Sequence, residues 1–92
     1  MIVRILGEGQ YDVPESAVDR LNELDAALEA AVDSGDEAAF ATALAALLDG
    51  VREAGAPHPA DALDESDSIL PPADATIDEV RELLTDEGLI PG

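Results

Sequence analysis

Few side chains in this sequence are suited to catalysis or to metal binding. The chain has one histidine, His58, and no cysteine. One histidine rules out a multi-histidine metal site, and the lack of cysteine rules out a thiol nucleophile and a thiolate metal centre. His58 stands between two prolines, which predicts an ordinary exposed histidine on a surface loop. No histidine or lysine is placed to activate a serine, so we expect no catalytic residues and no enzyme.

The acidic residues are dense, but their spacing does not match a cation site. One group falls in a single segment: Asp61, Asp64, Glu65 and Asp67. A calcium loop needs glycine at its sixth position and glutamate at its twelfth. Counted from Asp64, those positions hold Ile69 and Ala75. We therefore expect no metal site and no cofactor, beyond weak non-specific cation binding.

The Gly7-Glu8-Gly9 segment invites comparison with a phosphate-binding loop. A dinucleotide loop needs a third glycine and a helix that begins there. Here the third position is Asp12, and a second strand pattern follows the glycines. We interpret the segment as the turn of a β-hairpin, where glycine supplies a positive φ.

The charge of the chain is strongly one-sided. It carries 22 acidic residues against four arginines, for a net charge of −18. Nucleic acid is excluded as a direct ligand, because contact with phosphates needs a basic track. An anionic membrane surface would repel the chain, whereas a basic protein partner is permitted. We expect the charge to serve mainly for solvation, with self-repulsion at low ionic strength.

The N-terminal segment, residues 1–13, has the pattern of a β-hairpin. Val3 and Ile5 are expected on one face of the first strand and Arg4 on the other. Both faces are largely apolar, which predicts that each is at least partly covered.

Residues 15–55 carry apolar side chains at helical spacing on both sides of a short break. Gly35 is expected to cap the first helix and Asp36 to open the second, which gives an antiparallel helical hairpin. Gly50 lies inside the second helix and indicates either close packing against a neighbour or a weakened last turn.

The last third of the chain predicts one more helix. Ile69-Leu70 is a candidate short strand, and Thr76 to Glu79 fits a capping box that opens a helix over residues 76–87, with Gly88 as its C-cap. The expected fold is a single α+β domain, residues 1–92, with a small antiparallel sheet covered by the helical hairpin and the final helix.

The sequence shows no signal-peptide pattern and no membrane span. Its longest mostly apolar run, residues 38–48, falls short of the ~20 residues needed to cross a bilayer. We therefore expect a cytoplasmic protein without direct membrane insertion.

Four stretches carry a resemblance to a known family: residues 1–13, residues 21–25 (Leu-Asn-Glu-Leu-Asp), residues 69–76 (Ile-Leu-Pro-Pro-Ala-Asp-Ala-Thr) and residues 86–92 (Asp-Glu-Gly-Leu-Ile-Pro-Gly). In these the chain resembles the PspA-associated (PspAA) domain family of bacterial and archaeal envelope-stress systems. The resemblance implies a non-enzymatic accessory protein of the phage-shock stress response that acts with PspA, a long helical, membrane-remodelling protein. It implies no active-site residues.

The resemblance and the charge favour an adaptor that binds or regulates PspA, recruited to the inner face of the membrane through that partner. We expect the contact at Leu89 and Ile90, since apolar residues there are least needed by the core; the alternative is that they only staple the last helix or pair as a strand. Two other functions stay open. One is a small-molecule or cation-sensing domain with its ligand between sheet and helices, and the other is a self-associating module that forms a homo-oligomer.

Overall fold

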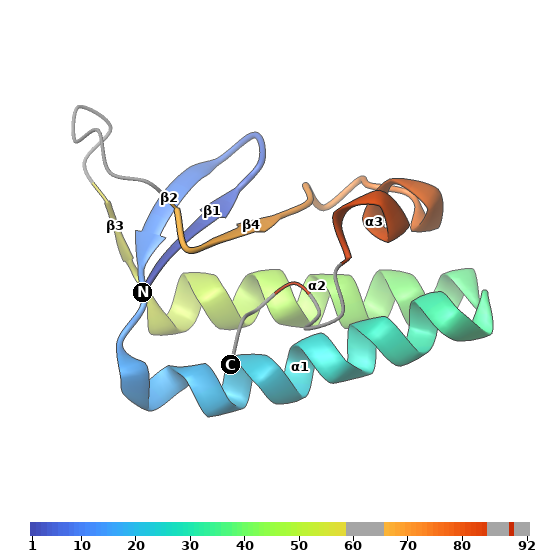
Figure 1. The fold of residues 1–92 in the computed structure, drawn as a ribbon, viewed down its shortest axis with the longest axis horizontal. Helices are drawn as coiled ribbons and strands as arrows, with labels where there is room; N and C mark the ends of the chain where they lie inside the picture. The colour runs from blue at the N-terminus through green and yellow to red at the C-terminus, as the bar shows by residue number, and fades with distance from the viewer. Residues whose placement is uncertain (59–65, 85–88, 90–92) are drawn as a thin grey trace.

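The computed structural model describes residues 1–58, 66–84 and 89, which form an α+β domain of two layers (Figure 1). One layer is a sheet with the strand order β3-β2-β1-β4, and the other is a pair of long helices beneath it. This arrangement confirms the predicted fold class.

The N-terminal hairpin forms as predicted. Strands β1 (Ile2–Ile5) and β2 (Gly9–Asp12) pair antiparallel, with Val3 opposite Tyr11 and Arg4 opposite Gln10. Gly7 and Gly9 have φ angles of 87° and 133°, a region that L side chains rarely adopt. The turn therefore depends on both glycines.

The helical hairpin follows at once. Helices α1 (Glu15–Ser34) and α2 (Glu37–Ala54) meet at Gly35, whose φ of 71° is the predicted left-handed cap. The Asp36 carboxylate accepts hydrogen bonds from the backbone N–H groups of Ala38 and Ala39, as expected of an N-cap.

Gly50 lies at a close contact between the two helices. A Cβ added at Gly50 would lie 2.8 Å from Leu24 Cδ1 and 3.2 Å from Leu21 Cδ2. Of the two interpretations of this glycine, the structure confirms close packing.

The sheet differs from the prediction in one respect. Strand β4 (Ser68–Leu70) confirms the candidate strand at Ile69-Leu70, but it pairs with β1 in parallel, so the sheet is mixed. A two-residue strand, β3 (Ala56–Pro57), pairs with β2 at the other edge. Spacing within a strand does not set the direction of its partner, so the sequence pattern could not distinguish the two arrangements.

Helix α3 (Ile77–Leu83) is shorter than predicted. Its N-cap is Thr76, whose hydroxyl oxygen accepts from the Glu79 N–H, as half of the predicted capping box requires. The helix ends because Leu84 adopts an extended backbone (φ −68°, ψ 136°). The predicted cap at Gly88 lies outside the described residues.

The core fills the space between the two layers. Its fully buried side chains come from the inner face of the sheet, from both long helices and from α3: Val3, Ile5, Leu21, Leu28, Val32, Leu44, Leu47, Leu48, Val51, Leu70 and Val80. Burial of these side chains orients the sheet, so that every second strand residue faces away from the helices.

Candidate functional site

The outer face of the sheet, opposite the long helices, is the most distinctive surface of the described structure. We use this name for Ile2, Arg4, Leu6, Gln10 and Ile69. The strand register places Arg4 beside Gln10 of β2 and Ile69 of β4. Residues that alternate with these, such as Val3, Ile5 and Leu70, point into the core.

The outer face combines exposed apolar side chains with a cation. Within the described residues, the large hydrophobic side chains that stay exposed are Leu6 (38%) and Ile69 (46%), and both belong to this face. Arg4 is also exposed, and it lies beside Ile69 in the strand register and two residues before Leu6. The sequence predicted that each face of β1 is at least partly covered, and on the outer face Ile2 is half-buried while Arg4 and Leu6 are exposed.

Arg4 differs from the other arginines in lacking an acidic partner in the described structure. Arg20, Arg52 and Arg81 each form ion pairs with nearby acids, whereas the Arg4 side chain has no hydrogen bond or ion pair among residues 1–58, 66–84 and 89. An unpaired arginine is unusual in a chain with a net charge of −18. In the sequence, Arg4 is recognisable as the one charged residue in an aliphatic strand, but its lack of an acidic partner is visible only in the structure.

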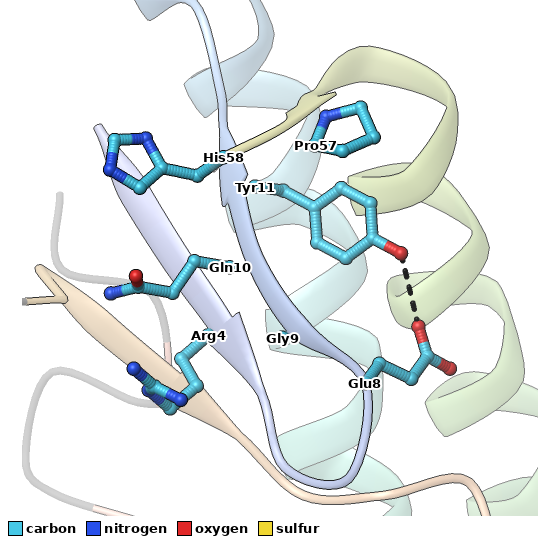
Figure 2. A pocket seen from close by; sticks show the side chains of 7 residues that line it. All are labelled: Arg4, Glu8, Gly9, Gln10, Tyr11, Pro57 and His58. Atoms are coloured by element: carbon cyan, nitrogen blue, oxygen red, sulfur yellow. Dashed lines mark hydrogen bonds between the residues drawn. The ribbon is translucent and has the colours of Figure 1, made fainter. Parts of the chain in front are cut away.

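A pocket of about 230 Å³ opens beside Arg4 at the edge of β2. Figure 2 shows Arg4, Gln10 and His58 projecting from one side of the hairpin, and Tyr11 and Glu8 lying on the side of α2. The strand β3 is too short to cover Gly9, which therefore lines the opening.

An ion pair fixes the wall of this pocket to α2. The Arg52 guanidinium donates from Nε to Glu8 Oε2 at 3.0 Å and from a second nitrogen to Glu8 Oε1, and the Tyr11 hydroxyl donates to the same carboxylate. Arg52 also pairs with Asp49. The hydrogen bond from Arg52 holds the pKa of the Glu8 carboxyl below its usual range and raises the pKa of Arg52. Glu8 thus anchors the hairpin turn.

His58 is not the exposed surface residue that the sequence predicted. Its side chain is only 11% exposed, and its Nδ1 lies 2.8 Å from Asp12 Oδ2. The backbone N–H of His58 donates to the Gln10 carbonyl, which continues the β3–β2 pairing by one residue. The flanking prolines predicted the extended backbone, but they could not show that the ring would fold onto β2.

The acidic group at residues 61–67 lies mostly outside the described residues. Asp67 is described, and its carboxylate accepts from the Ile2 N–H at 2.8 Å. Across residues 1–58, 66–84 and 89, no group of three or more potential ligands is arranged to hold a metal ion. In the same residues, no helix has the length and apolar character required to cross a membrane.

The C-terminal contact predicted at Leu89 and Ile90 is only partly visible. Leu89 is buried, with 5% exposure, and its N–H donates to both carboxylate oxygens of Asp25 on α1, at 2.9 and 3.2 Å. Its carbonyl accepts from the Ser68 hydroxyl. Ile90 lies outside the described residues. Binding through this segment stays a prediction. The described contacts of Leu89 are with α1 and β4, which favours a structural role for this residue.

Comparison with known families identifies the chain. The sequence model of the PspA-associated protein family, PspAA, matches residues 1–92. This chain belongs to the PspAA family. Comparisons with curated proteins and with solved structures gave no match.

In this PspAA chain, stretches that carried the family resemblance meet in space. Asp25, the last residue of the Leu-Asn-Glu-Leu-Asp stretch, accepts from the backbone N–H of Leu89 in the C-terminal stretch. Ser68 is the first residue of β4, which runs into the stretch of residues 69–76, and its hydroxyl donates to the Leu89 carbonyl. These contacts give Asp25, Ser68 and Leu89 a structural role.

Proposed function

We propose that this PspAA chain is a non-enzymatic adaptor that binds PspA and regulates it in the envelope-stress response. The observation that carries the proposal is the match to the PspA-associated family over residues 1–92. The outer face of the sheet supports it, because exposed Leu6 and Ile69 around an unpaired arginine suit contact with another protein.

The net charge supports a protein partner with basic surfaces. A domain of charge −18 attracts a basic protein over roughly one Debye length, about 8 Å at physiological ionic strength, and this speeds their encounter. The proposed location is the cytoplasm, with recruitment to the inner membrane face through PspA.

Co-purification with PspA tests the adaptor function. Tagged full-length PspA is used to capture the PspAA chain at about 0.05 M and at about 0.5 M salt, with another acidic protein of similar charge as the control. We expect retention of the PspAA chain at low salt, above the control, and reduced retention at high salt. Retention no greater than that of the control at low salt would refute the proposal.

The C-terminal segment offers a separate test of the predicted contact at Leu89 and Ile90. Leu89 can meet a partner only if it leaves Asp25 and Ser68. Deletion of residues 89–92 is expected to weaken PspA binding if the segment is released on binding. A deleted chain that folds and binds PspA as the full chain does would exclude a role for this segment.

The pocket beside Arg4 favours the small-molecule sensor as the second candidate function. Its ligand would lie at the edge of β2 and not between sheet and helices. Native mass spectrometry of the purified chain tests this function, since a bound metabolite adds a discrete mass. A spectrum of the bare chain alone, with unchanged PspA binding, would count against it.

A further inference from the structure

The outer face of the sheet has a charge distribution different from that of the helical layer. The long helices present exposed acids along their length: Glu15, Asp19, Glu23, Asp33, Glu37, Asp49 and Glu53. On the sheet, Asp12 is engaged with His58 and Asp67 with the Ile2 N–H. Both carboxylates therefore have partners of their own, and Arg4 is a cation on this face without an acidic partner in the described structure.

The width of this face is close to that of one helix, and on β2 the Gln10 amide already donates from Nε2 to Ser66 Oγ at 2.8 Å. Strands lie about 4.8 Å apart, so β2, β1 and β4 span about 10 Å between the outer strand axes. An α-helix with its side chains is about 10–12 Å wide. Ile69 lies beside Arg4 across this width, and Leu6 follows Arg4 by two residues along the chain.

We propose that the outer face docks one amphipathic helix of the partner protein, and that an acidic side chain on the apolar side of that helix pairs with Arg4. This inference rests on the proposed function and names its surface. Leu6 and Ile69 would contact the apolar stripe of the helix. The carboxylate would form an ion pair with the Arg4 guanidinium, which has no acidic partner in the described structure. A carboxylate placed elsewhere on the domain would meet like charge, so Arg4 also fixes the register of docking.

A second copy of this chain is a poorer occupant of the same face. Two copies would bring together charges of −18 each and would place Arg4 of one sheet against Arg4 of the other in a symmetric pair. Both effects oppose self-association through the outer face.

The test compares charge reversal at two arginines. Arg4→Glu removes the proposed contact, and Arg20→Glu makes the same change of charge on α1, where Arg20 is 71% exposed and pairs only with Glu23 in the described structure. Ile69→Ser tests the apolar part of the surface. Both outer-face residues are exposed, so the variants are expected to melt like the wild-type chain. Affinity for immobilised full-length PspA is measured by biolayer interferometry.

We expect Arg4→Glu and Ile69→Ser each to weaken the Kd at least about tenfold, as truncation of a hot-spot side chain does, and Arg20→Glu to change it less than about threefold. If the wild-type chain binds PspA and Arg4→Glu has the same Kd as Arg20→Glu, this inference is overturned and the adaptor function is unaffected. A wild-type dimer in light scattering that Ile69→Ser dissociates would also overturn it, in favour of a second copy. No binding by the wild-type chain would refute the adaptor function itself.

Discussion

Replacement of Asp25 by alanine is expected to lower the free energy of unfolding by about 2 kcal/mol, because a hydrogen bond to a charged group contributes roughly 1.5–3 kcal/mol. Asp25 is 3% exposed, and its carboxylate accepts from the Leu89 N–H through both oxygens. Without it, a buried N–H loses its partner. For a domain of this size, about 2 kcal/mol corresponds to a fall of roughly 8–16 °C in Tm.

The net charge by itself predicts that Asp25→Ala would raise the free energy of unfolding. Removal of one acid reduces self-repulsion in a chain of charge −18, which by itself favours the folded state. Asp19→Ala is the matched control, since Asp19 is an exposed acid on the same helix and its replacement makes the same change of charge and of helix propensity. We expect this control to be neutral or slightly stabilising.

Urea unfolding followed by far-UV circular dichroism is the suitable assay, because the chain has no tryptophan and a single tyrosine. Asp25→Asn should fall between the wild-type chain and Asp25→Ala, since its amide oxygen can still accept the Leu89 N–H. An Asp25→Ala chain as stable as Asp19→Ala would refute the view that this carboxylate holds the C-terminal segment.

Three further predictions concern the hairpin turn, the helix contact and the charge. Glu8→Gln should lower the free energy of unfolding by about 0.5–1 kcal/mol at pH 7. Because Arg52 lowers the pKa of Glu8, this stabilisation is present above the unfolded-state pKa of about 4.3 and is lost as the pH falls through the folded-state pKa. Unfolding curves of both chains at pH 7 and at about pH 3 test this. Gly50→Val should lower Tm by a few degrees, about 1 kcal/mol of overpacking, because its Cβ would lie 2.8 Å from Leu24 Cδ1 and the Leu24 side chain must shift; an unchanged Tm would show that this shift costs nothing. Added salt should raise Tm by screening the acids, and a flat or falling curve would exclude self-repulsion.

The elements of this fold could be predicted from local patterns. The positive φ at Gly35, the cap at Asp36 and the hairpin register follow from turn chemistry and from the alternation of apolar residues. The direction of β4 and the existence of β3 could not be predicted, because both depend on contacts between residues far apart in the chain.

The candidate surface was harder to predict than the fold. Arg4 was visible as a charged residue in an aliphatic strand, but its significance depends on the pairing of the other arginines, which only the structure gives. Leu89 was selected as a binding residue from its apolar character alone. In the structure Leu89 is buried, its backbone N–H donates to Asp25 and its carbonyl accepts from Ser68. Sequence spacing does not reveal these contacts, because both partners are far from Leu89 in the chain.

The position of β1 inside the sheet has a consequence for synthesis on the ribosome. Strand β1 is made first, yet one of its edges pairs with β4, whose last residue is Leu70. Until that point is translated, the backbone groups of Ile2 and Leu6 that bond Asp67 and Leu70 form an open edge on which another nascent chain could add. The mutual repulsion of acid-rich nascent chains would keep such edges apart, so the charge of this protein would protect it before it has folded.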